Sequence, residues 1–561
     1  MAIQLAMGDE SFEEIRSDGL YYVDKTELLY DLLERSRSKV ALFTRPRRFG
    51  KTLNMSMMQC FFDITRDSGD LFEGLAVTRH EEFCREWMNQ YPVLFISFKD
   101  VDGLNFEEAK KMLSSVLART FLKYADLAEN PDVASSDKER FQKILSETKE
   151  LSILKNSLDT LMRMMNAVYG KPVILLIDEY DVPLAKASEK NTPENRYYEQ
   201  MLDVIRGIMS ISLKTNDYLK FAVVTGCLRI AKESIFTGTN NFVSYSVLDE
   251  DFSEYFGFTQ QEMDQLLTDA DCSMQAPIVK EWYDGYLFGD TSVYCPWDVV
   301  NYVSRLLRKG VKEPKNYWLH TSSNSVIREF AGRYEVTNKF ETLMNGGAIT
   351  ETITDQLTYD LLRESEQNLW SILLMTGYLT KADPREKGDT VSLKIPNAEI
   401  AGVFQETVAG LFKETLDLSR QKALMEALWS GEEETASRMM SDLLWDTISY
   451  MDYHENYYHA FLAGLFVGRG YETESNKEAG LGRPDLQLFD RKNRRAMIIE
   501  AKKSGSQEQM QTDCEAALEQ IRERGYAKGI DPGYRTVLCY GISFFRKTAL
   551  VKKATDTGSS E

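Results

Sequence analysis

Strand patterns alternate with helical patterns along the first half of the chain. Apolar runs bounded by polar residues predict strands at residues 39–44, 92–98, 172–178 and 219–225. Apolar positions at helical spacing predict helices at residues 106–124 and 151–168. Continuous apolar strands that alternate with helices are typical of a mostly parallel sheet that is covered on both faces. The pattern therefore predicts an α/β domain at residues 1–257.

The pattern changes twice after this domain. From about residue 255 the strand runs fade, and residues 258–435 read largely as helices, which predicts a helical or winged-helix lid and a connector. A helix and three further strand patterns then predict a second α/β unit, with the strands at residues 485–489, 496–501 and 536–542. We therefore expect a C-terminal α/β domain at residues 436–552 and a flexible tail at residues 553–561.

An arginine-rich loop follows the first predicted strand and leads into a helix that opens near Thr52. Its last residues are Arg47, Arg48, Phe49, Gly50, Lys51 and Thr52. The final Gly-Lys-Thr is typical of a phosphate-binding loop, in which Gly50 lets backbone amides approach phosphate. Lys51 would then pair with the β and γ phosphates of ATP, and Thr52 would ligate Mg²⁺. The generic pattern asks for glycine at position 45, where this chain has arginine, so the motif alone also fits an ordinary helix start.

A second motif strengthens the prediction of a nucleotide site. The apolar strand at residues 172–178 ends in two adjacent carboxylates, Asp178 and Glu179. Asp178 would hold the Mg²⁺ shell, and Glu179 would polarise the attacking water. A buried strand that ends in a polar turn explains the apolar run but not a pair of acids in a chain that also carries Gly-Lys-Thr. Together the two motifs predict a site that binds and hydrolyses ATP.

Further residues are candidates for contact with the nucleotide. Thr225 closes a strand where many ATPases carry a polar residue that senses the γ phosphate, and Arg229 follows it. A strand end capped by a glycine turn explains the same residues equally well. Arg45, Arg47 and Arg48 would contact phosphates or the nucleotide of a neighbouring subunit in a homo-oligomer, or would form a solvated basic loop.

The C-terminal unit carries a second set of acids. Asp485 lies at a strand start, and Glu500 and Lys502 share one face of the next strand because strand side chains alternate. Two carboxylates beside a lysine would hold one or two Mg²⁺ ions and would activate a water that attacks a phosphodiester. Glu455 and His459 lie four apart on a predicted helix and would face the same site, with Glu455 as a fourth participant. Glu478 is a weaker candidate.

Charge decides whether nucleic acid can bind here. The formal net charge is −20, which repels nucleic acid on average. Residues 483–503 nevertheless carry seven basic and three acidic side chains, so a DNA or RNA backbone would bind locally. A hairpin that carries Asp, Glu and Lys on its polar face by chance is the alternative.

Composition narrows the class of protein. Hydrophobic residues make up 43% of the chain and charged residues 27%, which is typical of folded globular domains. No apolar run approaches the roughly 20 residues that span a bilayer, and no secretory signal is visible. We therefore expect a cytoplasmic protein without a membrane partner. The seven cysteines are scattered and the chain has only four histidines, which argues against a disulfide framework and a zinc site.

These motifs resemble a known family, the bacterial AAA-ATPase-like proteins whose C-terminal region looks like a PD-(D/E)XK nuclease. The resemblance covers nearly the whole chain and rests on residues 22–26, 45–52, 176–181, 225–226, 228–236 and 255–258. Arg45 departs from the generic phosphate-binding loop as this family does. The resemblance implies an ATPase of the additional-strand glutamate type, and Gln520 and Tyr526 resemble the Gln-and-Tyr helix of some nucleases of that superfamily.

Two functions remain open on the sequence. In the first, ATP gates the access of DNA or RNA to a Mg²⁺-dependent nuclease site. In the second, a nucleotide-switched regulatory or defence protein binds nucleic acid or protein through its C-terminal domain without cleaving. A structural partner that binds ATP without turnover is disfavoured by Glu179, because simple binding does not need an acid that polarises water.

Overall fold

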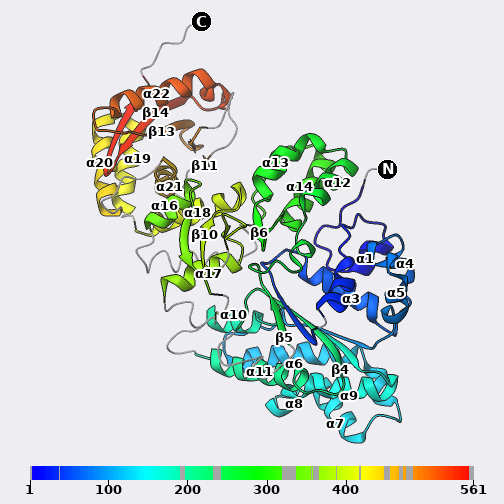
Figure 1. Cartoon of the computed structure of the whole chain (residues 1–561). Coiled ribbons are helices and arrows are strands. Elements are labelled where there is room, and N and C mark those ends of the chain that lie inside the picture. Colours follow the sequence, from blue (N-terminus) through cyan, green and yellow to red (C-terminus); the bar gives the residue numbers. More distant parts are fainter. Residues whose placement is uncertain are drawn as a thin grey trace. The chain divides into compact units, whose positions relative to one another are not determined.

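The structure is a computed structural model of the whole chain. It describes residues 3–36, 38–189, 196–230, 242–318, 337–354, 357, 365–386, 388–415, 418–447, 455–466, 472–475 and 484–554. The chain forms two compact units (Figure 1), of which the first comprises Met1–Tyr317 and Thr350–Glu399. The second comprises Trp318–Ile349 and Ile400–Glu561.

Five parallel strands form the central sheet of the first unit, in the order β2–β3–β4–β1–β5. Their bounds are β1 (Val40–Thr44), β2 (Val93–Ser97), β3 (Val173–Asp178), β4 (Leu219–Gly226) and β5 (Phe242–Tyr245). Strand β4 lies between β1, which leads into the arginine-rich loop, and β3, which ends in Asp178. One additional strand thus separates the two motifs, as the additional-strand type requires, and the predicted fold class is confirmed.

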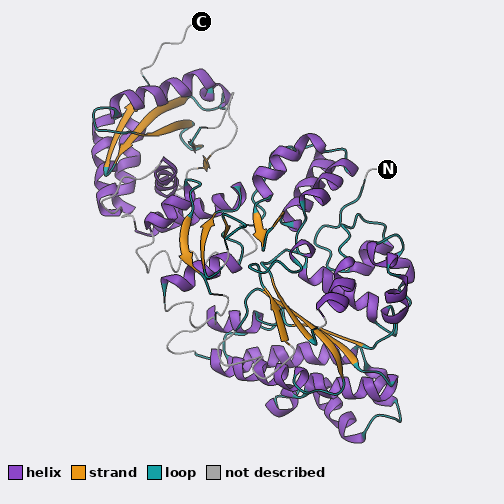
Figure 2. Ribbon diagram, in the orientation of Figure 1, coloured by secondary structure: helices purple, strands orange, loops and turns teal. Residues whose placement is uncertain are grey.

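Helices cover both faces of this sheet (Figures 1 and 2). All six residues of β3 are buried, and alternate residues Val173, Leu175 and Ile177 belong to one core with helices α6, α9 and α11. The intervening Ile174 and Leu176 point to the opposite face, where α3 packs. This two-sided burial explains why the strand is apolar at every position rather than at every second one.

The helices around the sheet have the following bounds: α1 (Phe12–Ser17), α2 (Glu27–Tyr30), α3 (Lys51–Phe62), α4 (Gly69–Phe72), α5 (Glu81–Trp87), α6 (Phe106–Leu122), α7 (Ser135–Leu145), α8 (Leu151–Lys155), α9 (Ser157–Tyr169), α10 (Val182–Glu189) and α11 (Tyr198–Leu213). The single helix predicted at residues 151–168 is wrong, because Asn156 separates α8 from α9. Strand β5 was not predicted from the sequence, since its four residues are only partly buried at the edge of the sheet.

The middle of the chain is helical, as predicted, but it also contains short strands. Its helices within the first unit are α12 (Gln260–Asp269), α13 (Ala276–Tyr283), α14 (Pro296–Lys309) and α17 (Glu366–Met375). A hairpin joins β6 (Tyr286–Phe288) to β7 (Thr291–Val293), and a small sheet has the order β8 (Ile349–Thr352), β10 (Thr390–Lys394), β9 (Thr380–Lys381). These strands are two to five residues long, which is too short for a clear periodic signal.

A mixed sheet forms the core of the second unit, in the order β11–β12–β13–β14–β15. The bounds are β11 (Glu472–Ser475), β12 (Leu486–Asp490), β13 (Arg495–Lys503), β14 (Thr536–Phe545) and β15 (Thr548–Lys553). Strands β13 and β14 are parallel and are connected through α22 (Met510–Arg524), which packs on both of them. The other strand pairs are antiparallel.

Further helices of this unit are α16 (Thr337–Met344), α18 (Ala398–Thr415), α19 (Leu418–Ser430), α20 (Glu433–Thr447) and α21 (Glu455–Phe466). Strand β15 was not predicted, and it extends the sheet to Lys553. Residues 555–561 of the predicted tail lie outside the described residues.

Candidate functional site

The arginine-rich loop leads from β1 into α3, and a left-handed residue closes it. Gly50 has a φ of 80° and caps the N-terminus of α3, which begins at Lys51. A Cβ atom at Gly50 would meet nothing within 4 Å, so backbone conformation rather than space requires glycine here. The first amides of a helix have no partner within the helix, and together with the helix dipole they attract an anion.

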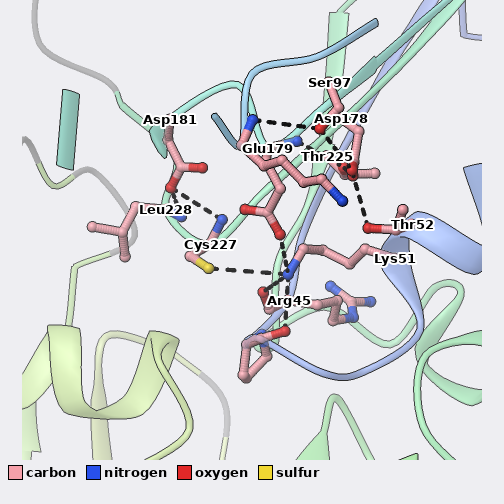
Figure 3. Close-up of polar contacts among 12 residues, drawn as sticks. Arg45, Lys51, Thr52, Ser97, Asp178, Glu179, Asp181, Thr225, Cys227 and Leu228 are labelled. Atoms are coloured by element: carbon pink, nitrogen blue, oxygen red, sulfur yellow. Dashed lines mark hydrogen bonds and ion pairs between the residues drawn. The ribbon is translucent and has the colours of Figure 1, made fainter. Parts of the chain in front are cut away.

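Lys51 is buried, and its ammonium group faces the backbone of this loop (Figure 3). Its Nζ donates hydrogen bonds of 3.0 Å to the carbonyl oxygens of Arg45 and Pro46 and lies 3.4 Å from Oε1 of Glu179. Burial alone would lower the pKa of Lys51, but neighbouring groups that include Cys227 and Glu179 raise it to about 12. Burial also raises the pKa of the Cys227 thiol to about 12. The acidic groups around Lys51 thus favour its charged form.

Asp178 joins the two sequence motifs. Its Oδ2 accepts hydrogen bonds from the hydroxyls of Thr52 at 3.0 Å and of Ser97 at 3.3 Å. Its Oδ1 accepts a hydrogen bond of 2.5 Å from the hydroxyl of Thr225 (Figure 3). Burial and the neighbouring Glu179 raise the pKa of Asp178, and the Thr225 hydroxyl opposes this shift. The predicted residues Thr52, Asp178 and Thr225 thus lie together at the carboxyl ends of the strands.

Glu179 follows directly in a left-handed conformation, with a φ of 52°. Its backbone amide donates to the Thr225 hydroxyl at 3.4 Å. Its Oε1 faces Lys51, whereas its Oε2 is buried and has no hydrogen-bond partner among the residues that the structure describes. The second carboxylate of the motif therefore has one oxygen available for a further partner.

The arginines before Gly50 do not form a solvated basic loop. Arg45 is fully buried: Nη1 donates to the carbonyl oxygens of Thr44 and Tyr245, and the guanidinium lies over the rings of Phe256 and Phe288. Burial lowers the pKa of Arg45 to about 10. The predicted contact of Arg45 with phosphate or with a neighbouring subunit is thus corrected, because rings distant in sequence enclose the side chain.

The other predicted loop residues differ in their surroundings. The ring of Phe49 is buried against the rings of Tyr286 and Phe288, so its backbone rather than its side chain would contact a ligand in the loop. Arg48 donates to the carbonyl oxygen of Tyr317 at 3.1 Å and lies beside α14. Arg47 is half-buried.

Arg229 is also half-buried, and it lies between Leu228 and Ile230. The backbone groups of these two neighbours bind the hydroxyl of Tyr180 at 2.7 and 2.9 Å. Ser97, Tyr180 and Asp181 were not predicted as site residues. Ser97 pairs with Asp178 across β2 and β3, and the order of the strands, on which this pairing depends, cannot be read from the sequence.

The second unit brings its predicted acids together. The amide of Asp485 donates to Oε2 of Glu500 at 3.4 Å, and Oδ2 of Asp485 accepts a hydrogen bond of 2.7 Å from the amide of Ala501. Nζ of Lys502 lies 3.7 Å from Oε1 of Glu500. The three residues predicted from the strand pattern are thus neighbours on β13 and at the start of β12.

Two helices add side chains to this cluster. Nε2 of His459 on α21 lies 3.2 Å from Oδ2 of Asp485, and the side-chain amide of Gln520 on α22 donates to Oε1 of Glu500. Tyr526 is instead buried in a small core with Ile498 and Ile521. Glu455 begins α21, but its side chain and the whole of Glu478 lie outside the described residues.

The Glu500 carboxyl group is a weaker acid than an ordinary glutamate. Burial and the nearby Asp485 raise its pKa to about 7, against the opposing effects of Lys502 and His459. No group of three or more His, Cys, Asp or Glu side chains arranged to hold a metal is found in the described ranges. Asp485 and Glu500 nevertheless offer two adjacent carboxylates, which are the ligands that Mg²⁺ prefers in proteins.

Comparison with known proteins identifies a domain around each candidate site. Residues 6–236 match a family model described as predicted AAA-ATPase, and residues 453–554 match a model of the PD-(D/E)XK nuclease superfamily. The chain carries both domains. The AAA-ATPase-like domain contains Lys51, Asp178 and Glu179, and the PD-(D/E)XK domain contains Asp485 and Glu500.

The similarity to one further protein extends over nearly the whole chain. An uncharacterised protein in the vnfD 5′ region of Azotobacter chroococcum mcd 1 is 23% identical over 560 residues, which is 98% of each chain. Within the part of the chain that the structure describes, no helix has the length and apolar character needed to cross a membrane.

Proposed function

We propose that the AAA-ATPase-like domain binds and hydrolyses ATP at the carboxyl-terminal edge of its sheet. The hydrogen bond of 3.0 Å between the Thr52 hydroxyl and Asp178 carries this proposal, because it joins the phosphate-binding loop to the strand that ends in two acids. Thr52 and Asp178 would hold Mg²⁺, which neutralises phosphate charge when it is bound. The amides at the start of α3 and the buried Lys51 would receive the β and γ phosphates.

The pairing of Lys51 with Glu179 suggests an order of events. Lys51 now lies 3.4 Å from Glu179. A γ phosphate at Lys51 would compete with the Glu179 carboxylate for the ammonium group. The Glu179 carboxylate would then be released from its ion pair with Lys51. Glu179 would then accept a proton from a water that attacks the γ phosphorus, while the bond to the β–γ bridging oxygen breaks and ADP leaves.

Two variants separate binding from hydrolysis. Lys51→Ala should weaken the binding of ATP, because it removes the buried ammonium group that would receive the β and γ phosphates. Glu179→Gln should leave binding of ATP largely intact and reduce hydrolysis by about 10²-fold or more, because the amide cannot accept the proton. Calorimetric titration and phosphate release measure the two properties. Failure of the unaltered protein to hydrolyse ATP would refute the proposal.

We further propose that the PD-(D/E)XK domain cleaves DNA or RNA phosphodiester bonds with the help of Mg²⁺. Asp485 and Glu500 would hold the ion, and Lys502 would orient or activate the water. The cluster of Asp485, Glu500, Lys502 and His459 supports this role. The exposed basic residues Arg491, Lys492 and Arg494, in the turn between β12 and β13, offer positive charge to a phosphate backbone.

A cleavage assay tests the nuclease proposal. Single- and double-stranded DNA and RNA are incubated with the full chain and Mg²⁺, with and without ATP, beside Lys51→Ala and Lys502→Ala. Cleavage that is lost in Lys502→Ala supports the nuclease, and the effect of Lys51→Ala then reports whether ATP gates it. Intact substrates together with continued ATP hydrolysis would favour a nucleotide-switched protein that binds without cleaving.

We propose that the protein acts in the cytoplasm. All seven cysteines are free, and they are distributed over both units. Reduced thiols are typical of a reducing compartment.

A further inference from the structure

Two buried residues directly after Glu179 hold the segment that follows β4. Oδ2 of Asp181 accepts hydrogen bonds from the amides of Cys227 at 3.1 Å and Leu228 at 3.0 Å (Figure 3). The hydroxyl of Tyr180 donates to the carbonyl of Leu228 at 2.7 Å and accepts from the amide of Ile230 at 2.9 Å. Tyr180 is fully buried and Asp181 is 1% exposed, so these bonds are shielded from water.

Glu179 and Tyr180 extend the pairing with β4 beyond the end of β3. The amide of Tyr180 donates to the carbonyl of Thr225 at 3.0 Å, while the amide of Glu179 faces the Thr225 hydroxyl. A Cβ atom at Gly226 would lie 2.6 Å from Oδ1 of Asp181 and 2.7 Å from the Tyr180 ring. The close approach of these segments therefore requires glycine at position 226.

Through Cys227, this arrangement connects Asp181 to Lys51 of the phosphate-binding loop. The amide that Asp181 holds belongs to Cys227, and Sγ of Cys227 lies 4.0 Å from Nζ of Lys51. Glu179 contacts the same ammonium group from the chain segment that Asp181 follows. Lys51 thus contacts both chain segments, and the hydrogen bonds that Asp181 accepts join one segment to the other.

We propose that Asp181 is a positioning residue for ATP hydrolysis, which seats the Cys227–Ile230 segment so that Lys51 and Glu179 keep their relative placement. This inference rests on the proposed ATPase function. Asp181 acts on this segment through the amides of Cys227 and Leu228, whose hydrogen bonds its Oδ2 accepts. We ascribe the positioning to these two hydrogen bonds rather than to the charge of Asp181, which also raises the pKa of Lys51. One acceptor oxygen is sufficient for both amides.

Two substitutions of Asp181 test whether an oxygen that accepts both amide hydrogen bonds is what the site requires. Asp181→Asn retains a side-chain oxygen that can accept both amides but removes the charge, whereas Asp181→Ala removes the acceptor. Misplacement of catalytic groups by about 1 Å costs up to about 10²-fold in rate. We expect Asp181→Ala to lower kcat for ATP by about tenfold or more, and Asp181→Asn to lower it by less than about threefold. The dissociation constant for a non-hydrolysable ATP analogue should change by less than about threefold in both.

Rates are normalised to the number of analogue-binding sites, so that loss of folded protein does not appear as loss of kcat. Asp203→Ala serves as the matched control, because it removes an exposed carboxylate that is paired with Lys155 on the outside of α11. Tyr180→Phe provides a second test, since it removes only the hydroxyl that binds Leu228 and Ile230, and it should also lower kcat per site.

The outcomes separate the inference from the proposed function. If Asp181→Ala and Tyr180→Phe both keep the kcat of the unaltered protein per site, Asp181 does not position the site. If Asp181→Asn is as impaired as Asp181→Ala, the charge rather than the acceptor matters, and the inference is overturned. If the unaltered protein binds the analogue but releases no phosphate from ATP, the ATPase proposal itself fails.

Discussion

Nη1 of Arg48 lies 3.9 Å from Oδ1 of Asp298, which joins the phosphate-binding loop to the first turn of α14. Asp298 is fully buried, and its burial raises the pKa of the carboxyl group while Arg48 opposes the shift. The Arg48 guanidinium also rests on the ring of Trp297. The loop is therefore anchored to the helical middle region through an arginine that the sequence pattern offered as a phosphate ligand.

This anchor predicts a specific coupling in stability. Arg48→Ala leaves the Asp298 carboxylate buried without its cation, and we expect the free energy of unfolding to fall by about 1–3 kcal/mol. Asp298→Asn alone should lower the free energy of unfolding by a smaller amount, because a neutral amide does not need a cationic partner when it is buried. In the double variant the loss should be smaller than the sum of the single losses, which a double-mutant cycle with thermal unfolding measures. Additive losses would contradict a direct interaction.

A second prediction concerns the close approach at Gly226. Gly226→Ala adds a methyl group within 2.6 Å of Asp181, and neither that buried carboxylate nor the Tyr180 ring can retreat cheaply. We expect a loss of stability of about 1–3 kcal/mol from overpacking, with lower ATP hydrolysis. Gly69→Ala is the matched control, because a Cβ atom there meets nothing within 4 Å in the first turn of α4. Equal melting temperatures for the two variants would refute the argument.

A third prediction concerns the hydroxyl of Thr225. Thr225→Val keeps the shape of the side chain but removes the donor of the 2.5 Å hydrogen bond to Asp178. A hydrogen bond to a charged group contributes about 1.5–3 kcal/mol, so we expect ATP hydrolysis to fall by about tenfold or more and the pKa of Asp178 to rise. Thr225→Ser keeps the hydroxyl and should retain most of the rate. Single-turnover hydrolysis compares the two variants, and equal rates would show that the hydroxyl is dispensable.

The sequence predicted those elements whose signal lies in residues that are close together along the chain. Strands β1 to β4 were predicted to within about two residues, because strands buried on both faces are apolar at every position. The placement of Glu500 and Lys502 on one face of a strand followed from the alternation of side chains, and the structure places Asp485 beside Glu500. These features depend on residues that are near each other in the chain.

The features that the sequence did not predict depend on contacts between residues that are far apart along the chain. Arg45 reads as a phosphate ligand or a solvated arginine until Phe256 and Phe288 are seen to enclose it. The role of Asp181 requires knowledge that β3 and β4 are neighbours, although Leu219 begins β4 forty-one residues after Asp178 ends β3. Neither relation leaves a periodic signal along the chain.

A fourth prediction concerns pH and Glu500. The pKa of this carboxyl group is 4.5 in an ordinary environment and about 7 in the folded protein. Between these values the folded state holds a proton that the unfolded state has released, so the free energy of unfolding should fall as the pH rises from 4.5 to 7. Glu500→Gln removes this dependence. The variant should gain stability relative to the unaltered protein as the pH increases, and the difference should level off above pH 7.

Lys502 provides the decisive comparison for this prediction. Its ammonium group, 3.7 Å from Oε1 of Glu500, opposes the rise in the pKa of Glu500. Lys502→Ala should therefore raise that pKa further and move the upper end of the pH window to higher values. Calorimetric unfolding of the full chain at a series of pH values, in the presence of a chelator, measures both effects. A window that stays in place in Lys502→Ala, or that persists in Glu500→Gln, would assign the titration to a different group.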